Sequence, residues 1–280
     1  MNSEPGKTRR SGIFLLPNLF TTAALFAGFY SIVAAVDGNF QTAGAAIFVA
    51  MVLDALDGRV ARLTRTSSQF GKEYDSLADM VSFGLAPAIV VYQWGVARLA
   101  EWNLAWGRVG WLVAFLFAVA AALRLARFNS QASTADRRFF VGLPSPSAAG
   151  LVAAFVWLSS KFDVSGLAGL AGAFTVTAIA GALMVSNFHY YSFKEVNFGR
   201  RIPFTWLLVI PLIFMFISLD PPSVFLLIFG TYAASGPAYW FWRVRRRRAR
   251  HAREPAARGR ETAAEDTRAE EARKEHDDAG

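Results

Sequence analysis

No cysteine occurs in the 280 residues of the chain, and histidine occurs only three times. Disulfide bonds, a thiol nucleophile and thiolate metal ligands are therefore excluded. We also find no Walker phosphate-binding loop and no serine-hydrolase elbow, two common motifs of phosphoryl and acyl transfer. With so few soft ligands available, any resident metal ion should be bound by oxygen atoms, which favours a hard cation over zinc.

Long apolar runs make up most of the remaining sequence. Apolar residues account for 54% of the chain, 25 residues are Phe, and the mean hydropathy is positive. The first run extends from Ile13 to about Val36, which is long enough to span a bilayer and lacks a clear signal-peptide cleavage site. We therefore expect an all-α polytopic membrane protein, a bundle of about eight transmembrane helices. The predicted spans are 13–36, 42–63, 77–96, 109–128, 146–160, 167–186, 204–219 and 223–242.

The loop charges predict the orientation of these spans. An even number of spans places both termini on one side, and we count fourteen basic residues on that side against three on the other. The three are Arg98, Arg108 and Lys161. The fourteen are Lys7, Arg9, Arg10, Arg59, Arg62, Arg65, Lys72, Arg124, Arg127, Arg137, Arg138, Lys194, Arg200 and Arg201. Because cytoplasmic loops carry the excess of Lys and Arg, both termini are expected in the cytoplasm, with the chain in the cell (inner) membrane.

Three regions follow from the change in composition. Residues 1–12 form a short basic N-terminal segment, 13–242 the transmembrane domain, and 243–280 a charged tail with 12 basic and 9 acidic residues. The tail has too few large apolar side chains to form a core and should be disordered or loosely helical. The arginine run 243–250 could bind nucleic acid in a soluble protein. Directly after a span it indicates instead the cytoplasmic end of a helix and contact with anionic lipid, so we expect no nucleic-acid partner.

Four aspartates at the ends of two apolar runs are the most informative feature. On an α-helix, Asp54 and Asp57 lie about 60° apart, and Asp75 and Asp79 are one turn apart. A charge near the bilayer core costs roughly 2.5–3.5 kcal/mol, so such residues are rare and usually functional. Clustered carboxylates are ligands for Mg²⁺ or Mn²⁺, and bound divalent ions beside a cation are typical of phosphoryl chemistry. The structural alternative is that the aspartates form salt bridges with Arg59, Arg62 and Arg65.

The full motif is Asp54-x2-Asp57-Gly58-x2-Ala61-Arg62-x8-Gly71-x3-Asp75-x3-Asp79. It resembles the signature of the CDP-alcohol phosphatidyltransferases at every fixed position. The resemblance implies displacement of CMP from a CDP-linked lipid or alcohol by a hydroxyl nucleophile. It does not determine the acceptor alcohol.

Residue roles follow from this resemblance. Asp54, Asp57 and Asp75 would bind the divalent metal, and Asp79 would contribute to a second ion or act as the catalytic base. The CDP-lipid would be bound by Gly58, Ala61, Arg62 and Gly71 together with Asn18, Thr21 and Thr22 of the first span. A homodimer is also expected from the resemblance.

Four further segments are similar to integral-membrane phosphatidylserine synthases within this family: 17–31, 122–129, 140–147 and 183–187. They imply CDP-diacylglycerol and L-serine as substrates, with membrane lipids around the protein. A serine pocket needs a cation for the carboxylate and polar acceptors for the ammonium, and a planar guanidinium suits the former. Arg124, Arg127 and Asn129 are the candidate serine- or phosphate-binding residues, although both arginines could simply be positive-inside anchors.

Three alternatives remain open at this stage. A sibling transferase would use glycerol 3-phosphate, inositol phosphate or choline as the acceptor. A cation transporter could use membrane carboxylates as an ion path, but all four acids lie towards one face of the membrane. The bundle could also merely anchor the arginine-rich tail as a platform for lipids or partners.

Overall fold

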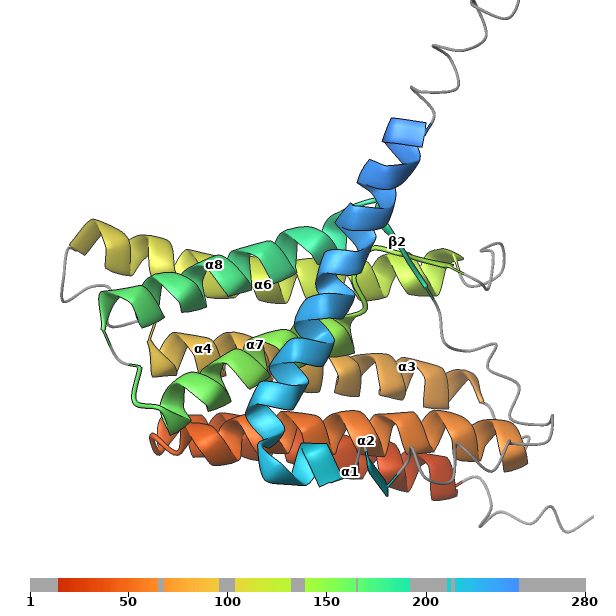
Figure 1. The fold of residues 1–280 in the computed structure, drawn as a ribbon. Helices are drawn as coiled ribbons and strands as arrows, with labels where there is room; N and C mark the ends of the chain where they lie inside the picture. Colours follow the sequence, from red (N-terminus) through yellow and green to blue (C-terminus); the bar gives the residue numbers. More distant parts are fainter. Residues whose placement is uncertain are drawn as a thin grey trace, which may run out of the picture. The chain divides into compact units, whose positions relative to one another are not determined.

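The structure is a computed structural model that describes residues 15–64, 68–95, 104–131, 139–164, 166–191, 211–212 and 215–246. The chain divides into two units, residues 1–235 and 236–280. Figure 1 shows the elements in chain order: α1 (Leu15–Val36), α2 (Phe40–Thr64), α3 (Gln69–Asp79), the π-helix η2 (Met80–Leu85), α4 (Ala86–Trp94), α6 (Leu104–Gln131), β1 (Phe139–Val141), α7 (Ser145–Lys161), α8 (Leu167–Val185) and β2 (His189–Tyr191). A further helix, Pro221–Arg246, begins in the first unit and ends in the second.

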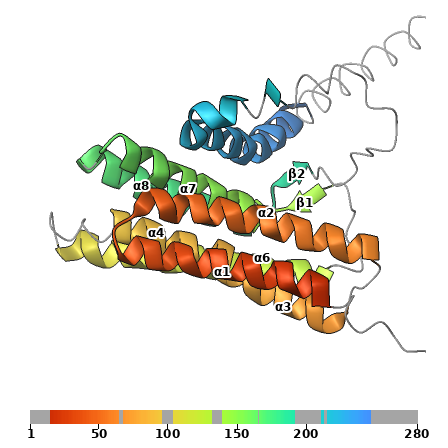
Figure 2. The ribbon, with the colours of Figure 1, turned by 90° about the horizontal axis from the view of Figure 1, so that it is seen from below.

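A tight turn joins α1 to α2 and sets them side by side (Figure 2). Gly38 has φ +76°, a left-handed conformation that glycine adopts without a steric penalty. The N–H of Asn39 donates to the carbonyl of Ala34 at 2.8 Å, and the Asn39 side chain accepts from the N–H of Thr42 at 3.3 Å. The turn thus ends α1 and begins α2, so the first turns of α1 lie beside the last turns of α2.

Helices α3, η2 and α4 follow one another without a break over 26 residues. The Ser68 hydroxyl caps α3 by accepting from the N–H of Gly71 at 2.9 Å. The wider turn of η2 begins directly after Asp79, and π-helical turns inside α-helices are often found at functional sites. The Ser82 hydroxyl of η2 donates to the carbonyl of Ala24 at 3.2 Å, which fixes η2 against α1.

Small residues dominate the core where the helices meet. Ala43 and Ala50 of α2, Ala149 and Ala153 of α7, and Ala180 of α8 are all fully buried. Without bulky side chains at these positions the helix backbones approach closely, the usual basis of packing between membrane helices. Helix α6 packs against α8, and α2 packs against α7, so the first unit is one continuous bundle.

The described residues are mostly helical, as predicted, and they also contain a small antiparallel sheet between β1 and β2 that the sequence did not predict. Phe139 pairs with Tyr191, Phe140 with Tyr190 and Val141 with His189. Three-residue strands in loops give no periodic signal, so the sequence did not predict them. Burial raises the pKa of Tyr190 to about 12. The phenol donates to the carbonyl of Ala233 at 3.1 Å, which ties β2 to the helix Pro221–Arg246.

Five helices of the described residues are long and apolar enough to cross a membrane. They cover 18–36, 69–94, 109–130, 167–185 and 221–246. Helices also occupy the predicted spans 42–63 and 146–160, as α2 and α7. Most of the predicted span 204–219, the segment 1–12 and the tail from 247 onward lie outside the described residues. The total of eight spans and the orientation of the termini therefore stay predictions.

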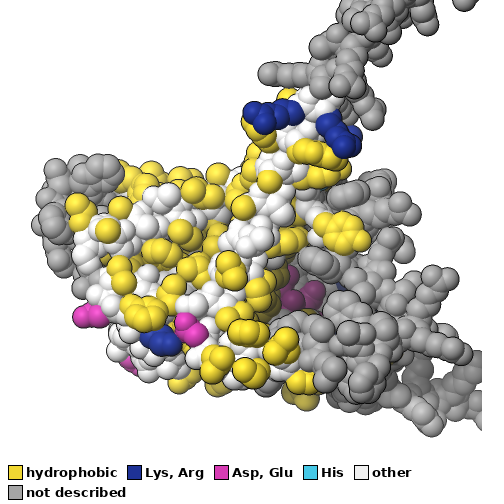
Figure 3. Space-filling view, in the orientation of Figure 1, with side chains coloured by type: hydrophobic (Ala, Val, Ile, Leu, Met, Phe, Trp, Pro, Cys, Tyr) yellow, Lys and Arg dark blue, Asp and Glu magenta, His cyan; other side chains and the backbone are white. Residues whose placement is uncertain are grey.

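The surface of the first unit supports a membrane location. Phe26 and Phe29 of α1 and Phe115 of α6 each expose more than half of their side-chain surface. Figure 3 shows hydrophobic side chains over much of the face drawn, with some acidic side chains set back from the surface and others exposed at the lower left. Exposed apolar surface of this extent is what a helical bundle in lipid presents, and the protein is an integral membrane protein.

Candidate active site

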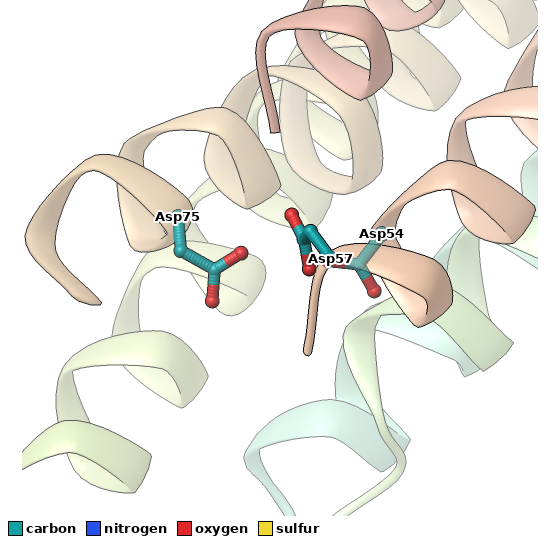
Figure 4. Close-up of side chains that lie close together, drawn as sticks. All are labelled: Asp54, Asp57 and Asp75. Atoms are coloured by element: carbon teal, nitrogen blue, oxygen red, sulfur yellow. The ribbon is translucent and has the colours of Figure 1, made fainter. Parts of the chain in front are cut away.

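Asp54, Asp57 and Asp75 lie together at the end of the bundle where α1 begins and α2 ends. One carboxylate oxygen from each lies within 4.8 Å of the other two. Figure 4 shows Asp75 of α3 facing the two aspartates of α2 across the gap between the helices. The helical spacing of both pairs predicted this meeting, because Asp54 and Asp57 share one face of α2 and Asp75 and Asp79 share one face of α3.

Asp79 joins the same cluster from the last residue of α3. Its side chain is hydrogen-bonded to that of Asp54 and is close enough to Asp75 for electrostatic repulsion between the two carboxylates. Two carboxyl groups in direct contact are the opposite of a structural salt bridge, in which each acid would meet a base. Such a contact requires a shared proton or a bound cation, and it argues against the salt-bridge interpretation of the motif.

A divalent ion fits the donor set. All the candidate ligand atoms are carboxylate oxygens, the ligand type preferred by hard cations. At a metal–oxygen distance of about 2.1 Å, two ligands on opposite sides of an octahedral ion are about 4.2 Å apart. The separations of up to 4.8 Å in the cluster approach this value, so small side-chain movements would allow Asp54, Asp57 and Asp75 to share one ion.

Helix α1 supplies hydroxyl groups to the cluster. The buried Thr21 donates to a carboxylate oxygen of Asp57 at 2.7 Å, which orients a side chain that is only 5% exposed. Thr22 hydrogen-bonds the carbonyl of Asn18 at 2.7 Å and shares a 2.9 Å hydrogen bond with the hydroxyl of Tyr74 on α3. All three predicted positions of the first span therefore face this end of the bundle. Tyr74 was not predicted, although it directly precedes Asp75.

The glycine-containing part of the motif lies beside these groups. A Cβ added to Gly58 would be 3.6 Å from the nearest guanidinium nitrogen of Arg62. The same guanidinium attracts the carboxylate of Asp57 electrostatically. A Cβ on Gly71 would come within 3.5 Å of the Asn18 side-chain oxygen. Ala61 is half-buried on the same helix. The structure therefore brings Gly58, Arg62, Gly71 and Asn18 to the acidic cluster.

Arg124, Arg127 and Asn129, near the end of α6, each reach a different element. Arg124 donates to the buried Ser145 hydroxyl at 2.6 Å and attracts the carboxylate of Asp79 electrostatically. Arg127 donates to the side-chain oxygen of Asn187 at 2.9 Å. Asn129 donates to the hydroxyl of Ser76 at 2.9 Å, directly beside Asp75 in the sequence. Sequence reasoning singled out the donors but not Ser76.

Three of the segments singled out in the sequence form one cluster here: 122–129, 140–147 and 183–187. Besides the two arginine hydrogen bonds, the N–H of Gly142 donates to the carbonyl of Phe188 at 2.8 Å, and that of Leu143 to the carbonyl of Leu183 at 2.9 Å. Gly142 has φ +83°, and a Cβ there would come within 2.3 Å of the Met184 carbonyl oxygen. Only glycine fits, so the backbone itself holds these segments together next to Asp79.

Comparison with known proteins identifies the shared part of the chain. Residues 14–187 match the family model of the CDP-alcohol phosphatidyltransferases. A Helicobacter pylori protein named CDP-diacylglycerol–serine O-phosphatidyltransferase is 39% identical over 232 residues, covering 82% of this chain and 92% of its own length. A Mycobacterium leprae protein of the same name is 39% identical over 167 residues, covering 58% of this chain and 53% of its own.

An archaeal protein from Methanothermobacter thermautotrophicus, named archaetidylserine synthase, is 35% identical over 177 residues, covering 62% of this chain and 69% of its own. The match extends over the acidic motif and most of the helical bundle. This chain belongs to the CDP-alcohol phosphatidyltransferase family.

Proposed function

We propose that the chain transfers the phosphatidyl group of CDP-diacylglycerol to L-serine, giving phosphatidylserine and CMP. Membership of the family supports the reaction type, and relatives from bacteria and archaea whose names specify serine support the acceptor. The observation that carries the proposal is the position of Asp79. It contacts the acidic cluster through Asp54 and interacts with Arg124, the half-buried cation of the neighbouring polar cluster.

Asp54, Asp57 and Asp75 are the residues proposed to hold divalent metal, Mg²⁺ or Mn²⁺, with Asp79 close enough to reach a second ion. When bound, the metal neutralises negative charge on the diphosphate and on the departing CMP. Thr21 orients Asp57 for this task through the 2.7 Å hydrogen bond.

The chemical step is a substitution at the lipid-side phosphorus. The serine hydroxyl oxygen attacks this phosphorus and forms the new P–O bond, while the bond to the CMP oxygen breaks and its electron pair leaves with CMP. Asp79 accepts the proton of the serine hydroxyl as the general base. Its position supports that role, because Asp79 lies between Asp54 of the acidic cluster and Arg124 of α6.

The CDP-lipid is proposed to lie along α2 and the start of α1. Gly58 and Ala61 leave space for the cytidine beside the backbone, and Arg62 and Gly71 position the phosphates. Asn18, Thr21 and Thr22 offer polar groups at the same end of the bundle. The acyl chains would extend sideways into the bilayer, past apolar surface such as that of α1.

The acceptor is proposed to bind on the other side of Asp79, against α6. Arg124 offers a planar guanidinium to the serine carboxylate. Arg127 and Asn129 shape this side of the site through Asn187 and Ser76. The pattern of basic loop residues supports a position of this end of the bundle at the cytoplasmic face of the inner membrane, where serine is available. Eight spans with both termini in the cytoplasm, and a homodimer, complete the proposal.

An acceptor panel tests the function. The full-length chain is purified in detergent micelles and given CDP-diacylglycerol with L-serine, glycerol 3-phosphate, inositol phosphate or choline, and CMP release is measured. Serine should give the highest rate, and chelation of divalent ions should abolish it. Transfer to glycerol 3-phosphate in the absence of transfer to serine would show that the acceptor assignment is wrong.

A further inference from the structure

Tyr74 of α3 is a polar group at the site that the proposed function does not use. Helix α3 packs against α1, and the Tyr74 hydroxyl lies 2.9 Å from that of Thr22. The neighbouring Thr21 donates to Asp57 at 2.7 Å, so α1 contacts both acid-bearing helices through consecutive residues. The Tyr74 ring stacks on that of Phe70, with centroids 6.0 Å apart and an interplanar angle of 13°. The phenol is therefore held on the α1 side of the acidic cluster, where the CDP-lipid is proposed to bind.

The direction of the hydrogen bond between Tyr74 and Thr22 follows from the other partner of Thr22. The Thr22 hydroxyl lies 2.7 Å from the carbonyl oxygen of Asn18, which can only accept, so its single proton is donated there. Tyr74 must then donate its own proton to Thr22. Within the part of the chain that the structure describes, the Tyr74 hydroxyl has no other hydrogen-bond partner. The phenol oxygen therefore offers a ligand acceptor lone pairs and no donor.

An acceptor at this position distinguishes between the parts of the CDP-lipid. The diphosphate and the ester groups of the diacylglycerol present acceptor oxygens, which the phenol oxygen would repel. The hydrogen-bond donors of the lipid are all in its nucleoside, namely the 4-amino group of cytosine and the hydroxyls of the ribose. Tyr74 is half-buried, so water competes less for its oxygen than at an exposed site. Serine also carries donors, but it is proposed to bind on the α6 side.

We propose that Tyr74 is a specificity residue for the nucleoside of the CDP-lipid. Its phenol oxygen accepts a hydrogen bond from the cytosine amino group or from a ribose hydroxyl, while its own proton is donated to Thr22. This inference rests on the proposed function and names the part of the donor lipid that α3 recognises. Consecutive residues of α3 then serve different parts of one substrate, Asp75 the diphosphate and Tyr74 the nucleoside.

The test compares four lipid donors in the wild-type chain and in Tyr74→Phe, both full-length, in micelles and with L-serine. The donors are CDP-diacylglycerol, its 2′-deoxy and 3′-deoxy forms, and UDP-diacylglycerol, in which a carbonyl oxygen replaces the amino group. Tyr74→Phe keeps the ring beside Phe70 and removes the acceptor. Its kcat/KM for CDP-diacylglycerol should fall about tenfold. For the analogue that lacks the bonded group, the value should stay within about twofold of wild type, because that hydrogen bond is already missing.

Ser82→Ala is the matched control. It also removes a hydrogen bond between α1 and the continuous helix formed by α3, η2 and α4, the 3.2 Å contact with the carbonyl of Ala24, and it leaves the phenol in place. The ratios of kcat/KM among the four donors should therefore be the same as in the wild-type chain. The KM for serine should be unchanged in both variants.

An equal loss with all four donors in Tyr74→Phe would assign a structural role to the phenol and overturn the inference. The absence of any loss would overturn it as well, and so would the same altered ratios in Ser82→Ala. In each of these cases the wild-type chain still transfers to serine, and the proposed function stands. A wild-type chain that forms no phosphatidylserine from CDP-diacylglycerol would show instead that the proposed function itself is wrong, and the inference would fall with it.

Discussion

The two sides of the site are built on opposite principles. On the α2–α3 side, four acids are brought together, and Asp54 and Asp79 are in direct contact. On the α6 side, each candidate donor has a neutral polar partner, as Arg124 has Ser145. The first arrangement is unfavourable until a cation binds, whereas in the second each donor already has one hydrogen-bond partner. The contrast indicates that the acidic side is maintained for chemistry, and that the α6 side is a preorganised surface for recognition.

The largest effect is expected from Asp79→Asn. Loss of a general base costs about 10²–10⁴-fold in rate, so CMP release in the presence of serine should fall by about three orders of magnitude. Thermal stability should be equal to or above that of wild type, because one charge leaves a cluster of like charges. The matched control is Glu73→Gln on the same helix, where the exposed side chain accepts from Gln69 at 2.9 Å. Near wild-type turnover of Asp79→Asn would remove the residue from the mechanism.

Metal binding should distinguish the acidic side from the α6 side without any assay of turnover. A ligand that binds only the folded protein raises its stability as its concentration increases, so Mg²⁺ or Mn²⁺ should raise the melting temperature of the wild-type chain after chelation. The increase should disappear in Asp75→Asn and persist in Arg127→Gln. Equal increases in both variants would show that the ions bind elsewhere.

A smaller and more selective effect is expected from Arg124→Lys. A lysine keeps the charge but lacks the planar pair of donors, so the KM for serine should rise about tenfold, equivalent to about 1.4 kcal/mol. Ser145→Ala, which removes the 2.6 Å partner of the guanidinium, should raise it less. A change in the KM for CDP-diacylglycerol instead of serine would indicate that Arg124 binds the lipid diphosphate.

Close packing behind the site should matter for stability. A Cβ on Gly28 would lie 2.4 Å from the Ser82 hydroxyl oxygen and 2.7 Å from its Cα, so α1 and η2 would have to separate. Overpacking of this kind costs about 1–3 kcal/mol, and Gly28→Ala should lower the melting temperature and the activity together. The control is Gly230→Ala, whose added Cβ would have its nearest neighbour at 3.9 Å. Equal melting temperatures of the two variants would contradict the packing argument.

The smallest effect is expected far from both sides of the site, at the ion pair of Lys161 and Asp220 (2.9 Å). Hydrogen bonding to Ser223 and the nearby ammonium of Lys161 lower the pKa of Asp220. A lowered pKa in the folded state stabilises the protein above the ordinary carboxyl range and ceases to do so as the pH falls through the folded-state value. Asp220→Asn should therefore lower the melting temperature slightly at pH 7 and leave it unchanged at strongly acidic pH. An effect that grows on acidification would reverse the expected sign.

Local patterns predicted the acidic side well, and long-range contacts limited the prediction of the other. The spacing of Asp54 to Asp57 and of Asp75 to Asp79 determines which face of a helix carries them, so their meeting could be predicted once the helices were adjacent. The hydrogen bond from Arg127 to Asn187 joins residues sixty positions apart. No periodicity predicts such a contact. The pairing of β1 with β2 depends on the same tertiary arrangement and was missed for the same reason.

The π-helical turn behind Asp79 has a consequence for how the sequence can change. Each additional residue in a helix rotates everything before it by about 100° relative to everything after it. Adding one residue to Met80–Leu85, where the wider turn already takes up an extra residue, would turn Asp75 and Asp79 away from α2 while every carboxylate remained in the chain. Substitutions in this six-residue segment should thus be far better tolerated than changes in its length. The length of this segment determines how the face of α3 that carries the aspartates is rotated relative to α4.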